Sequence, residues 1–295
     1  MFVAGIDGGG THTRLEMRDE ENHLLRRLEF GPFNINSIGA EAFRALLEEV
    51  FSTCGGLRDC GALCVGAAGI SNPRMGEILE ETLEAHHFSG RWKLCGDQEI
   101  ALRGAMDAPG VALIAGTGSI CFGKNTSGET ARTGGYGHLI DDGGSGYALG
   151  RDVLSLAVRQ LDGRSPGTAM RCAVYDCLGI SSPAELIAFV YSPQTDKSAI
   201  ARLSALALEL AAAGDEQAQE ILDWEAEELC RLTRAVQNRL GLRGCPIALL
   251  GGLLTQENVY RRLTVKKLAA LGTPVAPAHD ALWGAAQMAW ELTAR

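Results

Sequence analysis

Short apolar runs joined by small or polar turns alternate with longer helical repeats along this chain. Residues 2–6 have the pattern of a buried strand, residues 13–18 that of its hairpin partner, and residues 23–30 that of a third strand. The same order of strand, small-residue turn, strand, polar turn and strand returns at residues 111–115, 120–124 and 129–133. The pattern therefore predicts an α/β protein with two domains of duplicated origin.

Helical spacing fills most of the remaining chain. Residues 43–51, 73–85 and 98–105 predict helices in the first half, and residues 147–240 are almost wholly helical in pattern. Residues 218–240 form one long amphipathic helix whose other face carries Asp, Glu and Arg, as a solvated face usually does. A strand at 246–250, a helix at 256–271, a short strand at 273–276 and a helix at 280–292 complete the expected order.

The first small-residue turn has the composition of a phosphate cradle. Its glycines lack Cβ atoms, so backbone N–H groups can converge on an anion, and threonine hydroxyls add donors. Asp7, at the end of the first strand, can hold the water shell of Mg²⁺. A plain hairpin turn would have the same composition. The candidate nucleotide ligands here are Gly8, Gly9, Gly10, Thr11 and Thr13.

The second copy of the hairpin strengthens the phosphate interpretation. Its turn consists of Gly116, Thr117, Gly118 and Ser119, again between two short strands. Two hairpins of like design are able to face each other across a cleft and hold one polyphosphate from both sides.

A carboxylate and a glycine-rich loop are the other candidates for chemistry. Asp97 ends the short strand 92–96 and precedes a helix, a position where open α/β sheets bind ligands, although it is equally able to cap that helix. Residues 134–146 combine glycines, Tyr136 and two carboxylates, and suit contact with a sugar ring or a plain connector to a helix that begins near Ser145.

Three motifs carry a family resemblance over nearly the whole chain. Asp7-Gly8-Gly9-Gly10-Thr11, Gly116-Thr117-Gly118-Ser119 and Gly134-Gly135-Tyr136-Gly137-His138 resemble, in order and spacing, motifs of N-acetylglucosamine kinase-like members of the BadF/BadG/BcrA/BcrD ATPase family. That family is part of the actin, sugar kinase and Hsp70 superfamily. The resemblance implies two duplicated actin-like (ribonuclease H-like) domains, mixed sheets flanked by helices, with the nucleotide in an interdomain cleft. We expect the first domain at residues 1–115, with helix 284–295 packing back on it. We expect the second domain at residues 116–283, with a helical insertion.

The same resemblance implies the reaction and the residues that carry it. ATP with Mg²⁺ would donate its γ-phosphoryl group to the primary hydroxyl of an amino sugar, N-acetylglucosamine or glucosamine, and Asp97 would be the general base. Gly251 and Gly252 match the adenosine motif, although a strand-to-helix turn looks identical. The implied sugar ligands are Asn36, Asp97, Thr117, Gly135, Tyr136 and Asp142, of which Asn36 has a simple Asx turn as its alternative.

Departures from the family pattern leave the sugar open. Ile120 replaces an asparagine, Tyr136 a tryptophan, and Asp141 with Gly143 a glycine and a glutamate. Two other functions stay open as well. One is an ATP-driven activator of a 2-hydroxyacyl-CoA dehydratase or benzoyl-CoA reductase type of enzyme, although its cluster-cysteine motifs are not found. The other is a catalytically silent sugar-binding module.

Composition and charge limit the partners and the cellular compartment that we expect for this chain. The chain has 295 residues, 46% of them hydrophobic, and a net charge of −9, which argues against nucleic acid and anionic membranes as partners. Its apolar windows are too short for a membrane span, and no secretory leader precedes Asp7. Nine cysteines without a CxxC pair argue against a disulfide framework or a zinc site. We expect a cytoplasmic enzyme with a small-molecule sugar substrate, assembled as a homodimer.

Overall fold

The computed structural model describes residues 1–294 and contains two compact units. One unit comprises Met1–Ala108 together with the chain from Pro277 onward, and the other comprises Pro109–Ala276. The boundary expected after residue 115 would have separated strand Gly110–Ala115 from the sheet to which it is bonded. The segment before the last helix also belongs to the first unit, because the N–H groups of Ala278 and His279 donate to the carbonyls of Ala105 and Gly104 at 3.0 and 2.9 Å.

A five-stranded mixed sheet forms the centre of the first unit, with strand order β3-β2-β1-β4-β5. The first three strands are antiparallel neighbours, whereas β4 runs parallel to β1, and β5 runs parallel to β4. The strands are β1 (Phe2–Gly8), β2 (Thr13–Asp19), β3 (Leu24–Phe30), β4 (Cys60–Ala67) and β5 (Arg91–Gly96).

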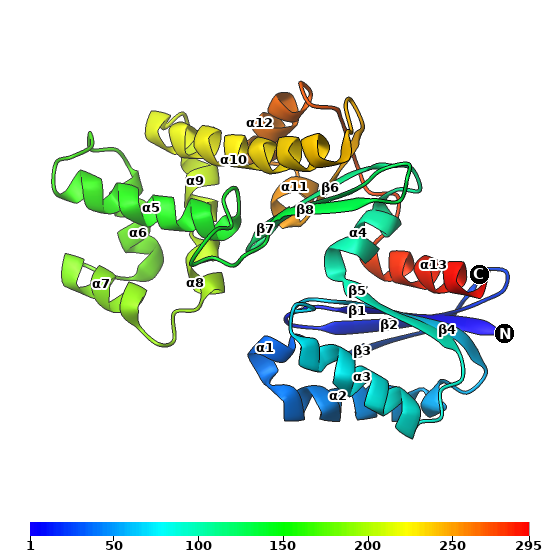
Figure 1. The fold of residues 1–295 in the computed structure, drawn as a ribbon. Coiled ribbons are helices and arrows are strands. Elements are labelled where there is room, and N and C mark those ends of the chain that lie inside the picture. Colours follow the sequence, from blue (N-terminus) through cyan, green and yellow to red (C-terminus); the bar gives the residue numbers. More distant parts are fainter. Residues whose placement is uncertain (295) are drawn as a thin grey trace. The chain divides into compact units, whose positions relative to one another are not determined.

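Helices cover both faces of this sheet (Figure 1). On one face α2 and α3 bury a core with Phe43, Leu47 and Met75, and on the other α4 and α13 pack on Val3 and Cys64. At Gly5 of β1 a Cβ atom would lie 2.5 Å from the backbone nitrogen of Ala286, so glycine lets α13 pack directly on the strand. The helices are α1 (Ile35–Ile38), α2 (Ala40–Thr53), α3 (Pro73–Ala85), α4 (Asp97–Ala105) and α13 (Ala281–Thr293).

The second unit repeats the sheet topology of the first. Its strand order, β10-β9-β6-β7-β8, is the order of the first sheet written from the other edge, with antiparallel β6, β7 and β8 and parallel β9 and β10. The duplication predicted from the strand pattern is therefore confirmed at the level of pairing. The strands are β6 (Gly110–Ala115), β7 (Ser119–Lys124), β8 (Thr130–Gly134), β9 (Pro246–Leu250) and β10 (Thr273–Val275).

Eight helices belong to the second unit. The long helix α10 packs against β7 and β8, where Val236 would touch any side chain placed at Gly123. The helix predicted for 256–271 is the shorter α12, which begins only at Val259, because the side chain of its N-cap Asn258 accepts from the N–H of Arg261. The helices are α5 (Gly146–Leu161), α6 (Met170–Leu178), α7 (Pro183–Tyr191), α8 (Lys197–Arg202), α9 (Ser204–Ala212), α10 (Glu216–Leu240), α11 (Gly252–Thr255) and α12 (Val259–Leu268).

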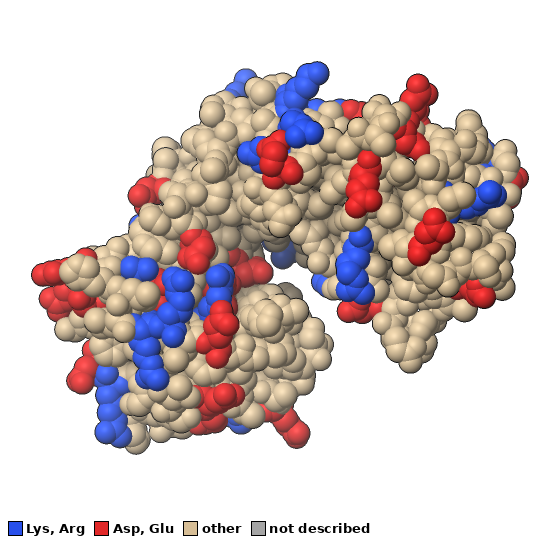
Figure 2. Space-filling model, turned by 180° about the vertical axis from the view of Figure 1, so that it is seen from behind, with Lys and Arg blue, Asp and Glu red and all other residues tan. Residues whose placement is uncertain are grey.

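Within residues 1–294, no single helix has the length and apolar character needed to cross a membrane. Helices α6 and α7 have that length and apolar character only when they are taken together, and they are bent by 62° relative to each other. On the face seen in Figure 2, Asp and Glu side chains border a short row of Lys and Arg.

Candidate functional site

The first glycine turn is narrower than the sequence suggested. Strand β1 continues through Asp7 and Gly8, which pair with Arg14 and Thr13 of β2. The turn is closed by the N–H of Gly9, which donates to the carbonyl of His12 at 3.0 Å. A Cβ atom at Gly8 would lie 2.4 Å from the Phe33 ring, so packing of that ring explains this glycine. No atom within 4 Å would meet a Cβ at Gly10, which leaves the backbone there open to a ligand.

Thr13 does not have the role expected of it. Its side chain is fully buried, and its hydroxyl donates to the carbonyl of Gly31 at 2.6 Å. The hydroxyl proton is therefore committed to joining β2 to the end of β3. Thr11 is exposed in the turn and remains the threonine able to donate to a phosphate.

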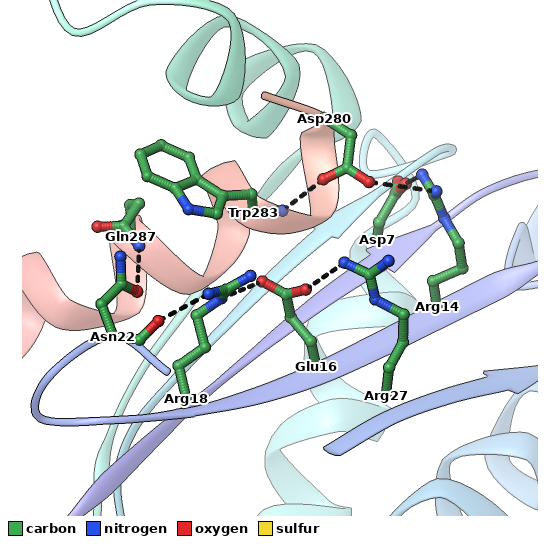
Figure 3. Close-up of polar contacts among 9 residues, drawn as sticks. All are labelled: Asp7, Arg14, Glu16, Arg18, Asn22, Arg27, Asp280, Trp283 and Gln287. Carbon is green, nitrogen blue, oxygen red and sulfur yellow. Dashed lines mark hydrogen bonds and ion pairs between the residues drawn. The ribbon is translucent and has the colours of Figure 1, made fainter. Parts of the chain in front are cut away.

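Asp7 is held by an arginine on the neighbouring strand (Figure 3). The Arg14 guanidinium donates to Asp7 Oδ2 at 2.6 Å, and its other terminal nitrogen lies 3.5 Å from Asp280, which caps α13. Burial lowers the pKa of Arg14, but its bond to Asp7 and the surrounding carboxylates outweigh burial and leave that pKa raised. Figure 3 also shows Glu16 between Arg18 and Arg27, whose nitrogens lie 2.6 and 2.8 Å from its oxygens.

The residues around Asp7 fit a magnesium ion that is bound mainly through water and substrate phosphates. Among residues 1–294, no group of three or more His, Cys, Asp or Glu side chains is arranged to hold a metal. Mg²⁺ usually keeps several waters and binds through one or two carboxylates plus substrate phosphates. A single carboxylate beside an open glycine turn fits that mode, and Arg14 already occupies one of its oxygens.

Two roles were possible for Asn36, a sugar ligand or an Asx turn, and the turn is made by Asn34 instead. Asn34 makes the Asx turn, because its side chain accepts from the N–H of Asn36 at 3.0 Å. The Asn36 side chain is instead held by Asn72, whose amide donates to Asn36 Oδ1 at 2.9 Å. Its Nδ2 would lie 3.1 Å from a Cβ atom at Gly69. Asn36 is therefore exposed and oriented, as a sugar ligand needs to be.

Asp97 is the first residue of α4 and follows the carboxyl end of β5. Its Oδ1 accepts from the N–H of Gln98 at 2.9 Å, and the residue is partly buried. Glu99 meets the capping need, because its side chain accepts from the N–H of Gly96 and also bonds Lys93 at 3.2 Å. The unusual flanking residues thus close the helix end, and Asp97 itself is not the N-cap.

The second glycine turn is tightly ordered from behind. The N–H of Gly116 donates to the carbonyl of Gly118 at 2.9 Å, and the carbonyl of Gly116 accepts from the N–H of Gly146 at 2.8 Å. The Ser119 hydroxyl donates to the carbonyl of Gly143 at 2.6 Å. Thr117 lies at the tip of the turn, where its N–H and hydroxyl have no partner among residues 1–294.

Asp142 faces this turn, and the expectation that it binds sugar hydroxyls is not met here. The residue is 4% exposed, and its carboxylate accepts from the N–H of Ser119 at 3.3 Å. A Cβ atom at Gly118 would lie 2.9 Å from Asp142 Oδ2. Burial raises the pKa of Asp142, while the Ser119 N–H opposes that shift. The carboxylate orders the phosphate turn, which side-chain periodicity alone does not reveal.

Gly135, which precedes Tyr136, lies beside Ile120, the position that departs from the family pattern. A Cβ atom at Gly135 would lie 2.8 Å from Ile120 Cδ1, and Gly135 has a φ of +72°, which glycine adopts without strain. Tyr136 is 60% exposed, with the Arg132 guanidinium 5.0 Å from the centre of its ring. The structure thus places one of the two expected sugar contacts, Gly135, against Ile120.

A cavity of about 520 Å³ joins the phosphate turn to the predicted adenosine motif within the second unit. Gly116 and Thr117 form one part of its wall, and Gly252 and Asn258 form another. Gly251 has a φ of +83°, and a Cβ atom there would lie 2.3 Å from the carbonyl oxygen of Ala115, so only glycine brings β9 this close to the turn. The predicted residues of two distant motifs therefore line one cavity.

Helices α8 and α9 complete the cavity, although no motif in their sequence indicates a binding role. Their contribution includes Arg202, Ser204 and Leu208. These residues lie in the helical insertion, where the pattern indicated only amphipathic packing. A further cavity of about 710 Å³, along α10 and α12, contains none of the predicted site residues.

The comparison with protein families decides the relationship. The model of the BadF/BadG/BcrA/BcrD ATPase family matches residues 4–289. The chain belongs to this family. It is 32% identical over 296 residues to an N-acetylmuramic acid/N-acetylglucosamine kinase of Clostridium acetobutylicum, covering 96% of each chain. It is 29% identical to an N-acetyl-D-glucosamine kinase of Dictyostelium discoideum, covering 90% of this chain and 89% of that one.

A solved structure supports the same relationship. It is that of an inferred N-acetylglucosamine kinase from Chromobacterium violaceum, with a TM-score of 0.74 and 26% sequence identity. The match covers 97% of this chain and 98% of the other. The expected actin-like fold of a BadF/BadG/BcrA/BcrD family member is thereby confirmed.

Proposed function

We propose that this chain is an ATP-dependent phosphotransferase that acts on the primary hydroxyl of an amino sugar such as N-acetylglucosamine or glucosamine. The observation that carries the proposal is the cavity that brings the Gly116–Ser119 turn and Gly252 together, because a nucleotide needs a phosphate cradle and a purine surface at one site. The curated relatives that match over nine-tenths or so of the chain are named as sugar kinases, which supports the same activity.

The mechanism assigns separate tasks to the two units. Asp97, at the end of a strand and not needed as a helix cap, would accept the proton of the acceptor hydroxyl. Backbone N–H groups of Gly10 and Thr11 in one turn, and of Thr117 and Gly118 in the other, would bind phosphate oxygens. Bound Mg²⁺ would neutralise phosphate charge, with Asp7 holding its water shell.

The acceptor sugar would lie against Asn36, Gly135 and Tyr136. Asn36 offers an oriented carboxamide, and Tyr136 offers an exposed ring on which a sugar face can pack. Asp142 would support this site indirectly, because its bond to the Ser119 N–H fixes the turn that contains Thr117.

We also propose a cytoplasmic homodimer. All nine cysteines are free, and Cys64 and Cys95 remain unbonded with their sulfurs 3.9 Å apart, as suits a reducing compartment. Exposed apolar residues on α7, Ile187 and Tyr191, favour a surface that a second copy would cover.

A coupled assay with a sugar panel tests the function. We expect phosphorylation of at least one of glucosamine, N-acetylglucosamine and N-acetylmuramate, with ATP turnover that depends on the sugar and on Mg²⁺. An activator would hydrolyse ATP without any sugar, and a silent module would bind a sugar without turnover. Either result would reject the kinase assignment.

Substitution of Ile120 tests the acceptor wall. Because Ile120 contacts Gly135, we expect Ile120→Asn to change the ranking of sugars by roughly tenfold or more while KM for ATP stays nearly constant. A site that hydrogen-bonds a substituent rejects analogues that lack it more strongly than an apolar site does. KM and kcat for each sugar and for ATP provide the check. Loss of ATP affinity with an unchanged ranking would place Ile120 outside the acceptor site.

A further inference from the structure

A buried carboxylic acid and a buried phenol bind the same glycine of the loop that follows Tyr136. The N–H of Gly144 donates to Glu225 Oε2 at 2.5 Å, and its carbonyl accepts from the Tyr260 hydroxyl at 2.9 Å. Glu225 of α10 is 1% exposed and Tyr260 of α12 is fully buried. The phosphotransfer mechanism above uses neither residue. Burying two such polar groups is costly, and each is satisfied here through Gly144.

Gly144 is closely fitted to α10. It has a φ of +81°, and a Cβ atom there would lie 2.4 Å from Leu229 and 2.9 Å from the carbonyl oxygen of Glu225. The N–H of Gly144 is thus paired with α10, and its carbonyl is paired with α12. The loop cannot shift relative to α10 or α12 without breaking a buried hydrogen bond.

Gly143, directly before Gly144, and Gly146, two residues after it, hold the Gly116–Ser119 turn. Gly143 accepts from the Ser119 hydroxyl at 2.6 Å, and Gly146 donates to the carbonyl of Gly116 at 2.8 Å. Any displacement of Gly144 therefore moves partners of Gly116 and Ser119, the two ends of the turn.

Tyr260 connects the same glycine to the other side of the nucleotide cavity. It is the second residue of α12, and the N-cap of that helix, Asn258, lines the cavity. Asn258 also donates to the carbonyl of Leu253 at 3.0 Å, which ties the start of α12 to the segment after Gly252. The phosphate turn and the adenosine segment are thus joined through one buried contact.

We propose that Glu225 and Tyr260 are positioning residues of the nucleotide site, which fix through Gly144 the spacing between the Gly116–Ser119 turn and the adenosine segment 251–258. This inference rests on the proposed function. It concerns the spacing between the purine and the phosphates, so it predicts a larger effect on nucleotide binding than on the acceptor sugar.

The charges around Glu225 indicate which form of the carboxyl group makes this contact. From α5, Arg151 lies 3.5 Å from Glu225 Oε1 and Asp152 shares a hydrogen bond with the carboxyl group. From α12 the neutral hydroxyl of Tyr260 faces it. Burial raises the pKa of Glu225 to about 8; Asp152 adds to the shift, and the Gly144 N–H and Arg151 oppose it. The raised pKa favours the protonated carboxyl group, which is able to donate to Asp152 while it accepts from Gly144. Glutamine reproduces that pattern.

Calorimetric titration of the full chain with Mg²⁺ and AMP-PNP at pH 7 tests the proposal. We expect Tyr260→Phe and Glu225→Ala each to weaken AMP-PNP binding by roughly tenfold, because each leaves one buried polar group of Gly144 unpaired. Glu225→Gln should bind within about twofold of wild type, since a conservative replacement keeps both hydrogen bonds. KM for the sugar should change far less than AMP-PNP affinity in all three. If Glu225→Ala fails to fold, Tyr260→Phe and Glu225→Gln still decide the question.

Thr233→Val is the matched control on the same helix. Thr233 is fully buried on α10 and its hydroxyl donates to the Leu229 carbonyl of its own helix at 2.9 Å, without contact to Gly144. We expect it to lower Tm with AMP-PNP affinity unchanged. Wild-type affinity in Tyr260→Phe, or an equal loss in Thr233→Val, would overturn the positioning role. A wild-type chain that binds no AMP-PNP would instead reject the proposed function itself.

Discussion

We expect Asp97→Asn to lower kcat by about 10²- to 10⁴-fold, while KM for the sugar changes little. Asparagine keeps the shape of the side chain and still accepts from the Gln98 N–H, as Asp97 Oδ1 does at 2.9 Å. What it loses is the capacity to take the proton of the acceptor hydroxyl. Steady-state kinetics with the preferred sugar, alongside thermal melting of the same preparation, measures both quantities.

Two comparisons separate a general base from other roles at this position. Asp7→Asn should weaken the Mg²⁺-dependent step and recover in part at raised Mg²⁺, because the role proposed for Asp7 is to hold the water shell of the metal. Asp97→Asn should show no such recovery. Loss of a helix cap costs about 0.5–2 kcal/mol of stability with activity retained. An Asp97→Asn enzyme that melts earlier yet phosphorylates its sugar at near wild-type rate would exclude the base role.

The fold was largely predictable because its signals are local. The alternation of apolar runs with glycine turns gave the strands, and the repeated order of those strands gave the duplication that the two sheet topologies confirm. Errors were confined to boundaries. Strand β1 extends through Gly8 because its ladder with β2 continues to the pair Gly8 and Thr13, which a count of apolar residues does not reach.

The site was less predictable because side-chain direction depends on neighbours distant in sequence. Thr13 and Asp142 have residue types suited to ligands, yet each is turned into the protein by a partner, Gly31 in one case and the Ser119 turn in the other. The parts of the cavity formed by α8 and α9 come from an insertion with no motif of its own.

Glu225 is the residue that the sequence pattern could have shown. It lies three residues after Leu222 and four before Leu229, both of which face the core, so it falls on the apolar side of α10. The charges of this helix, counted together, predict one solvated face. A single acidic residue within an apolar stripe is a different signal, because its burial requires specific partners.

We expect Glu225→Gln to flatten the pH dependence of stability between about pH 5 and pH 8. The pKa of Glu225 is raised to about 8 in the folded chain, mainly by burial, whereas an unfolded glutamate titrates near 4.3. In this window the native state holds a proton that the unfolded state has released. Stability therefore falls as pH rises, by at most about 1.4 kcal/mol per pH unit from this group, and the fall ends above the native pKa.

Urea midpoints of wild type and Glu225→Gln, recorded at several pH values, measure the effect. The variant should gain on wild type steadily from pH 5 to pH 8, and the difference should stay constant at higher pH. Glu228→Gln is the control, because Glu228 lies one turn further along α10 and is paired with Arg231 at 2.5 Å with 27% of its side chain exposed. Its curve should run parallel to that of wild type. Parallel curves for Glu225→Gln as well would mean that Glu225 is already ionised in the folded chain, and that its contact with Gly144 is made by a carboxylate.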